Sequence, residues 1–286
     1  MTAPTESKEM SDAPSPAATA PGTPVAPPPG ARIIAITSGK GGVGKTFVSA
    51  NLAAALTRRG LRVLVLDADL GLANLDVVLN LHPKITLHDV FTGKSSLDDA
   101  VIAAPGGFSV VLAGSGMVEY SRLTPEVRNQ FLSVIQTLAP RFDVILLDTG
   151  AGISDVVLFS VSLASEVLIV ATPEPTSLTD AYAAIKVLAM QQQRQHIRIV
   201  VNQTARPGDG RAITSQLQQV LERFVTTNSG RPLRLIHMGD IPADSAVREA
   251  VMRRQLLLLH VPGCPAALAI SQLAGKIEEA LLTRPA

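Results

Sequence analysis

Short continuous runs of aliphatic residues alternate with helical patterns along most of this chain. A run that is apolar at every position indicates a strand covered on both faces, because a half-exposed strand would alternate apolar with polar residues. A repeated order of strand then helix is typical of a parallel sheet with right-handed crossovers. Strands are expected at residues 32–37, 62–67, 108–112, 143–148, 166–170, 197–201 and 233–236.

Helical patterns occupy several of the intervals between these runs. The clearest follows Thr124, a residue type that caps helix N-termini, and has Pro125 in its first position. Gly60 is expected to end the helix after the first strand. Helices are expected at residues 47–56, 124–138, 177–192 and 266–282. The pattern predicts an α/β fold: a single domain over residues 31–286, with a doubly wound, mostly parallel sheet and helices on both faces.

Composition sets limits on this domain. Hydrophobic residues make up 47% of the chain, which is typical of a globular protein. Residues 1–30 are rich in proline and alanine and lack the basic start and apolar run of a signal peptide, so we expect a disordered extension. The net charge of +1 argues against DNA as a partner. Cys264 is the one cysteine, so we expect it to be buried in a cytoplasmic protein without disulfides.

The most informative motif follows the first predicted strand and precedes the first predicted helix. It matches the phosphate-binding pattern G-x-x-x-x-G-K-[ST], which makes this a candidate P-loop NTPase. Glycines let backbone amides turn inward around a triphosphate, Lys45 is expected to pair with the β- and γ-phosphates, and Thr46 to hold Mg²⁺. The loop consists of Gly39, Lys40, Gly41, Gly42, Val43, Gly44, Lys45 and Thr46, and we add the adjacent Phe47 to the expected nucleotide contacts.

Carboxylates follow two of the predicted strands, where ligands bind in open α/β sheets. Asp148 ends an aliphatic run and is interpreted as the aspartate that holds Mg²⁺ directly or through water; capping of the next turn is the alternative. Asp67 and Asp69 close the second strand. We expect Asp67 near the metal and Asp69 to orient the attacking water; a solvated turn is the alternative for the pair.

Adenine contacts are expected farther along the chain. Asn202 ends the strand at 197–201, where its amide could hydrogen-bond to the adenine ring or cap a turn. Residues 239–244 are expected after the last strand, with Pro242 against the base. A glycine-rich turn at 150–152 lies beside the predicted magnesium site. The sequence therefore predicts ATP and Mg²⁺ as cofactors.

Four stretches give a closer resemblance. Lys40, the extra lysine in the loop, marks the deviant Walker A group of MinD and ParA ATPases. The stretches DADLGLANLD (67–76), DTGAGIS (148–154) and TPEPTSLTDAYAAIK (172–186) resemble the FlhG (FleN, YlxH) branch of that group. The resemblance extends over residues 32–282. The stretches at 148–154 and 172–186 are more specific to this branch than to MinD or ParA.

The resemblance implies an activity and partners that could not be inferred from composition. Family members are ATPases whose ATP-bound monomers pair face to face, so Lys40 would reach the phosphates of the partner subunit. Asp69 matches the family's hydrolytic aspartate and Asp148 its magnesium-linked one. Members set flagellar number and placement, act with the GTPase FlhF, and in some lineages restrain a flagellar transcription activator. A peripheral position at the inner membrane or cell pole is also implied.

Two departures from the family pattern qualify these expectations. Residues 1–30 lack the Asp-Gln-Ala-x-x-Leu-Arg segment with which many members stimulate the GTPase. The last predicted helix has Ile270, Leu273, Ile277 and Leu281 on one face but lacks a basic face, which favours core packing over membrane contact. The arginine pair 253–254, followed by the leucines 256–259, is a second candidate for membrane contact. We expect instead that the arginines are solvated and that residues 256–259 form a buried strand or linker.

Three functions compete on the sequence alone. The first is an ATP-dependent dimerisation switch that regulates flagellar assembly. The second is a division-site or DNA-partitioning ATPase of the MinD or ParA kind, which the low net charge disfavours for DNA. The third is an anti-activator held by ATP with negligible turnover. An iron-protein reductase, which shares the fold, is disfavoured because it needs paired cysteines for its cluster and this chain has one cysteine.

Overall fold

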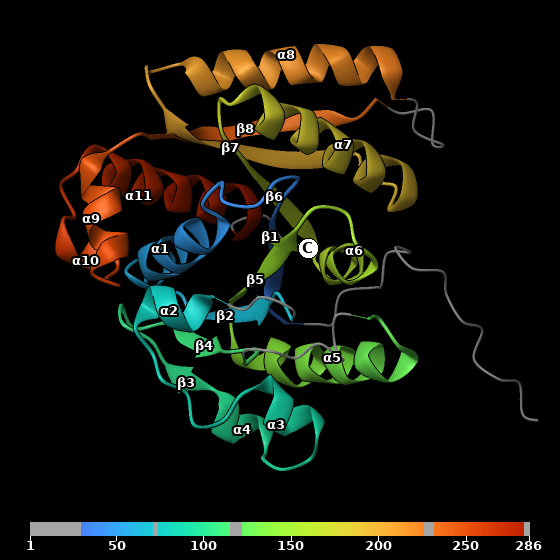
Figure 1. Cartoon of the computed structure of the whole chain (residues 1–286), viewed down its shortest axis with the longest axis vertical. Coiled ribbons are helices and arrows are strands. Elements are labelled where there is room, and N and C mark those ends of the chain that lie inside the picture. Colours follow the sequence, from blue (N-terminus) through green and yellow to red (C-terminus); the bar gives the residue numbers. More distant parts are fainter. Residues whose placement is uncertain (1–29, 71–73, 115–121, 226–231, 283–286) are drawn as a thin grey trace, which may run out of the picture.

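The structure is a computed structural model that describes residues 30–70, 74–114, 122–225 and 232–282. The expected disordered extension, apart from Gly30, lies outside the described residues, as do residues 71–73 of the second-strand motif. Figure 1 shows a central sheet with helices on both sides.

Eight strands form one sheet in the order β3-β4-β2-β5-β1-β6-β7-β8. Every neighbouring pair is parallel except β3 with β4 at one edge, so the predicted doubly wound, mostly parallel sheet is confirmed. The strands are β1 (Arg32–Ser38), β2 (Val63–Ala68), β3 (Ile102–Ala103), β4 (Ser109–Val111), β5 (Val144–Ala151), β6 (Glu166–Ala171), β7 (His196–Thr204) and β8 (Arg234–Pro242).

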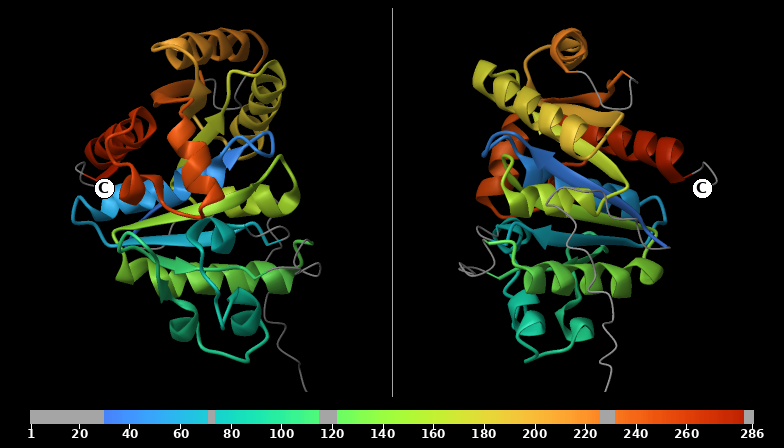
Figure 2. Two further views of the ribbon diagram at one scale, coloured as in Figure 1. Left: turned by 60° about the vertical axis from the view of Figure 1, so that its left-hand side comes forward. Right: turned by 90° about the vertical axis from the view of Figure 1, so that its right-hand side faces the viewer.

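The helices divide between the two faces of the sheet, as Figures 1 and 2 show. They are α1 (Lys45–Thr57), α2 (Leu75–Leu79), α3 (Leu87–Phe91), α4 (Leu97–Ala100), α5 (Pro125–Leu138), α6 (Asp155–Ser162), α7 (Pro175–Gln191), α8 (Asp209–Phe224), α9 (Ser245–Met252), α10 (Leu257–His260) and α11 (Pro265–Ile277). A 3-10 turn, Ala139–Arg141, follows α5, and a π turn, Glu278–Leu282, follows α11. Helices α5 to α8 share one core with the sheet, and α1, α2, α10 and α11 share the other.

Alternate residues of each central strand enter opposite cores. In β1, Ile33 and Ala35 pack among α5 to α8, whereas Ile34 and Ile36 pack against α1 and α11. All four are at most 1% exposed. This two-sided burial explains why the strands appear in the sequence as continuous apolar runs.

The capping prediction at Thr124 is confirmed. Its side chain accepts a 3.3 Å hydrogen bond from the Val127 amide, and Pro125 is the first helical residue. The last predicted helix is also confirmed as a core element, because Ile270, Leu273 and Ile277 are at most 1% exposed. The side chain of Leu281 lies outside the described residues.

Two sequence expectations about the C-terminal half are wrong. Strand β8 continues to Pro242, so residues 239–242 belong to it rather than following it. These residues pair with β7, and this tertiary pairing overrides the low strand propensity of glycine, aspartate and proline. Residues 256–258 are buried as expected, but Leu257 and Leu258 belong to the short helix α10, with Leu256 as its N-cap, rather than to a strand or linker. In the described part of the chain, no helix is long and apolar enough to cross a bilayer.

Candidate functional site

The loop of residues 39–46 connects β1 to α1 at the carboxyl ends of the central strands. Gly42 and Gly44 have φ angles of 78° and 96°, a region that favours glycine, and Gly44 is the N-cap of α1. A Cβ added to Gly42 would meet no atom within 4 Å, so the backbone there borders open space. The amino end of α1, which begins at Lys45, therefore faces an accessible cavity, as anion-binding loops require.

The base of the loop packs directly on α7. A Cβ on Gly39 would lie 2.1 Å from the backbone carbonyl carbon of Asp180, a distance that no side chain tolerates. Gly39 is required here by close approach of two main chains, since the φ angle of Gly39 is not in the left-handed region.

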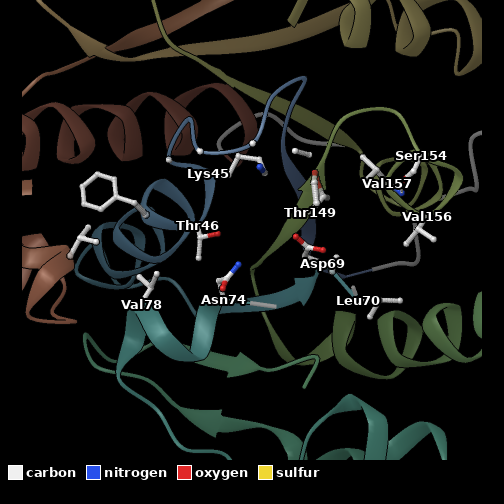
Figure 3. A pocket seen from close by; sticks show the side chains of 18 residues that line it. Lys45, Thr46, Asp69, Leu70, Asn74, Val78, Thr149, Ser154, Val156 and Val157 are labelled. Atoms are coloured by element: carbon white, nitrogen blue, oxygen red, sulfur yellow. Dashed lines mark hydrogen bonds between the residues drawn. The ribbon is translucent and has the colours of Figure 1, made fainter. Parts of the chain in front are cut away.

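The loop forms one wall of a cleft of about 630 Å³, a volume within the usual range for ligand sites. Figure 3 shows Lys45, Thr46, Asp69 and Asn74 with their polar ends toward the centre of the cleft. They come from α1, the end of β2 and the start of α2. The cleft is lined by Gly41, Gly42, Gly44, Lys45, Thr46, Phe47, Ala68, Asp69, Leu70, Asn74, Val78, Thr149, Gly150, Ala151, Ser154, Val156, Val157 and Val251.

Asp148 lies beneath this cleft on β5 and is 3% exposed. Its Oδ1 accepts a 2.8 Å hydrogen bond from the Ser49 hydroxyl, and the Thr46 side chain is near enough to lower its pKa. Burial raises the pKa of Asp148 from 3.8 to about 6, although the two hydroxyls and the nearby Lys45 ammonium oppose the rise.

Asp67 is the neighbour of Asp148 across the β2–β5 pair and is 1% exposed. One carboxylate oxygen accepts from the Asp69 amide at 3.1 Å, and the other has no hydrogen-bond partner among the described residues. Burial, and then the charge of Asp148, hold the pKa of Asp67 well above its ordinary value. Two buried acids side by side, one with an unused oxygen, form a site that a cation would stabilise.

Lys45 and Asp69 provide the charged groups at the cleft surface. Burial lowers the pKa of Lys45, while the negative charges of Asp148 and Asp69 oppose this shift. Asp69 also approaches the turn after β5, because a Cβ on Gly150 would lie 3.3 Å from Asp69 Oδ1. The small residue at 150 therefore leaves room for the Asp69 carboxylate beside the loop.

Lys40 lies away from the cleft. Its Nζ donates to Glu174 Oε2 at 2.9 Å and to Thr176 Oγ1 at 2.8 Å, at the amino end of α7. The Lys40 and Glu174 side chains are 36% and 63% exposed, so the pair lies on the rim of the site.

The structure brings most of the predicted site residues together. Gly41, Gly42, Gly44, Lys45, Thr46, Phe47 and Asp69 line the cleft, and Asp67 and Asp148 lie beneath it. Gly39, Lys40, Val43, Asn202 and Pro242 do not line it. The Asn202 side chain donates to the Val43 carbonyl at 2.8 Å and accepts from the Gln203 amide at 3.0 Å, so its amide braces the loop from below.

Sequence reasoning did not find several residues of the site. Ser49 follows Thr46 by three positions, a spacing that places both hydroxyls on one face of a helix, and this signal was available. Asn74, Val78 and Val251 reach the cleft from α2 and α9, short helices that the sequence analysis did not assign.

Comparison with known proteins places the chain in a family. A family model described as "ParA: NUBPL iron-transfer P-loop NTPase" matches residues 30–278. The chain is 42% identical over 247 residues to the antiactivator FleN of Pseudomonas aeruginosa, covering 86% of each protein. The chain belongs to the FleN and YlxH branch of the ParA family. It is also 33% identical over 253 residues to the flagellum site-determining protein YlxH of Helicobacter pylori, covering 88% of this chain and 83% of that protein.

Solved structures of the ParA family agree with the fold. The cell division ATPase MinD of Pyrococcus furiosus has a TM-score of 0.69 at 30% identity, covering 87% of this chain and 99% of that one. MinD of Pyrococcus horikoshii complexed with Mg-ADP has a TM-score of 0.69 at 27% identity, covering 90% and 100%. The predicted P-loop NTPase fold and family are therefore confirmed. With Cys264 as its one cysteine, this sequence lacks the paired thiolates of an iron–sulfur site.

Proposed function

We propose that this chain is an ATPase that regulates flagellar number and placement through ATP-dependent pairing of two copies. The observation that carries the proposal is the arrangement around the loop of residues 39–46. An open glycine-lined backbone lies beside an inward-facing lysine, a threonine and two buried aspartates. Similarity to FleN and YlxH supplies the biological setting.

The residues present fit a magnesium nucleotide. The unused oxygen of Asp67 and the paired hydroxyl and carboxylate of Thr46 and Asp148 are the donor types that Mg²⁺ prefers. In this proposal Lys45 and the amides of residues 39–46 hold the β- and γ-phosphates, and Thr46, Asp67 and Asp148 hold the metal. When bound, Mg²⁺ would neutralise charge on the phosphates.

Hydrolysis depends in this proposal on Asp69. Its carboxylate lies at the cleft surface, beside the glycine turn after β5 and opposite Lys45. From there it orients a water molecule for in-line attack on the terminal phosphate. Phe47 and Pro242 remain proposed contacts for the adenine base. Asn202, whose side chain hydrogen-bonds to the Val43 carbonyl, is proposed to support the loop as well as to contact the base.

Pairing of two copies gives Lys40 its proposed role. In the face-to-face dimer its ammonium would contact the phosphates of the partner subunit, so Lys40 must first leave Glu174 and Thr176. A positive group supplied across an interface couples turnover to assembly. The dimer is thereby formed with ATP and lost after hydrolysis.

The proposed partners follow from the relatives. The name of the Pseudomonas relative, an antiactivator, favours a flagellar transcription activator as one partner. The name of YlxH, flagellum site-determining, favours a role in placing flagella. An FlhF-like GTPase as partner, and a cytoplasmic location with peripheral contact at the membrane or pole, are proposed from the family resemblance. An antiactivator held by ATP with negligible turnover is the second candidate; the name of the Pseudomonas relative favours the antiactivator role.

Asp69→Ala separates these two candidates. Phosphate release and binding of a fluorescent ATP analogue would be measured for wild type and variant. We expect Asp69→Ala to bind nucleotide as wild type does and to lose about 100-fold or more in turnover, since a group acting in the transition state is removed. Equal background rates in both proteins would instead support the antiactivator without turnover. Absence of binding in wild type would contradict both.

A further inference from the structure

Ser49 is a buried hydroxyl one turn into α1. Its side chain is 0% exposed, and its Oγ lies 3.0 Å from the Lys45 carbonyl and 2.8 Å from Asp148 Oδ1. A serine hydroxyl has one proton to donate. The shorter contact and the carboxylate acceptor make Asp148 the stronger partner.

One face of α1 directs two hydroxyl-bearing residues toward the Asp148 carboxylate. Thr46 and Ser49 are three positions apart on α1, and the Ser49 hydroxyl donates to this carboxylate at 2.8 Å, while the Thr46 side chain lies near it. Asp67 is the β2 neighbour of Asp148, and the charges of the two carboxylates repel each other. Thr46 is itself a proposed metal ligand, so Ser49 is the contact whose hydroxyl is free to orient Asp148 alone.

We infer that Ser49 is a positioning residue that orients the Asp148 carboxylate toward magnesium, through the hydrogen bond from Ser49 Oγ to Asp148 Oδ1. The inference rests on the proposed nucleotide function. Ser49 does not touch nucleotide or metal, because it lies beneath the cleft and does not line it. Partners that fix a metal-linked carboxylate typically change metal affinity by about 10- to 100-fold when removed.

Ser160 provides a matched control. It is also helical, on α6, is 1% exposed, and donates to the carbonyl four residues earlier, Val156, at 2.9 Å. Ser49 makes the same kind of backbone contact with Lys45. The two serines therefore differ mainly in the bond to Asp148, and Ser160→Ala reproduces the loss of a buried hydroxyl without touching the site.

The experiment measures binding rather than turnover. Fluorescent ADP would be titrated into each full-length protein across a series of Mg²⁺ concentrations and in EDTA. We expect Ser49→Ala to need about 10-fold more Mg²⁺ than wild type for half of the magnesium-dependent gain in affinity. Its affinity in EDTA should match that of wild type. Ser160→Ala should behave as wild type throughout, and Ser49→Thr, which keeps the hydroxyl, should restore the magnesium midpoint.

The outcomes distinguish this inference from the proposed function. Equal magnesium midpoints for Ser49→Ala and Ser160→Ala would overturn the positioning role while leaving nucleotide binding intact. If the ADP affinity of the wild-type protein does not depend on Mg²⁺ concentration, both the proposed function and this inference are overturned. If the extra methyl of Ser49→Thr prevents folding, seen as a lost thermal transition, the comparison of the two alanine variants decides alone.

Discussion

The two lysines of the loop lie in contrasting surroundings. On the inner side, Lys45 is packed among Thr46, Asp148 and Asp69, and burial shifts the pKa values of both Lys45 and Asp148. On the rim, Lys40 forms an exposed ion pair with Glu174. The same residue type, five positions apart, is therefore enclosed by the fold in one case and held by a surface contact in the other.

The difference separates binding from switching. Buried charges that are short of partners lower the stability of the empty site and favour an ion or ligand that completes it. An exposed ion pair contributes about 0–1 kcal/mol, so it is exchanged at little cost. The inner side is thus suited to hold a nucleotide, and the rim to change partners. Substitutions on the two sides should separate these roles.

Lys45→Ala should have the largest effect. Loss of charge-assisted hydrogen bonds to two phosphates, each worth about 1.5–3 kcal/mol, is expected to weaken ATP binding by about 10³-fold. Fluorescent ATP titration is the measurement, with the exposed Lys94→Ala as a control for loss of a positive charge. An affinity within about 10-fold of wild type would contradict the inner assignment.

Asp148→Asn should stabilise the protein when nucleotide and metal are absent. Because the pKa of Asp148 rises from 3.8 to about 6 on folding, the folded protein binds more protons than the unfolded chain between those values. Stability therefore falls as pH rises through this window and stays lower above it. The variant should gain about 3 kcal/mol near neutral pH, and its stability should fall less between about pH 4 and 6.

Urea denaturation in EDTA across this pH range measures the effect. Asp67 adds a slope of the same sign, since its pKa is also raised. Asp143→Asn is the opposite control, because the Arg62 guanidinium lowers the pKa of Asp143. That carboxylate stabilises the fold above its unfolded pKa, and its loss should destabilise the protein at neutral pH. Unchanged stability of Asp148→Asn would show that the buried charge of Asp148 does not destabilise the fold.

Lys40→Ala should leave binding intact and remove pairing. ATP affinity is expected within about twofold of wild type, since Lys40 does not line the cleft of its own subunit. Turnover should fall about 100-fold, as when one charge-stabilising donor is lost. Sedimentation velocity with ATP is the check, and a normal dimer in the variant would remove Lys40 from the interface.

Glu174→Gln should have the smallest effect. Folding stability is expected to change by less than about 1 kcal/mol, because the pair with Lys40 is exposed. Without its anionic partner Lys40 is released more easily, so ATP-dependent pairing should tighten by about two- to threefold. Urea denaturation and sedimentation measure the two quantities. Weaker pairing in this variant would mean that Glu174 helps assembly instead of competing with it.

The sequence was most informative where structure depends on neighbours in the chain. The turn at Gly42 and Gly44 follows from the backbone freedom of glycine, and Asp148 was found because it ends a continuous apolar run. Helix α8 was not assigned, although Leu217 and Leu221 have helical spacing among polar residues. The spacing of these leucines was sufficient to predict the helix from the sequence.

Other features depend on contacts between distant segments. The partner of Lys40, Glu174, is 134 positions away, and the bond between Ser49 and Asp148 spans 99 positions. The extension of β8 through Pro242 depends on the strand beside it rather than on its own residues. Such contacts are set by how the sheet and helices pack, and a residue pattern does not encode them locally.

The approach of Gly39 to Asp180 has a mechanical consequence. Two main chains meet there with no side chain between them, so no change of rotamer can absorb a shift of either one. Any molecule that displaces α7 must then move the base of the nucleotide loop as well. By reciprocity, a ligand that alters nucleotide affinity through this contact has its own affinity altered by nucleotide to the same degree.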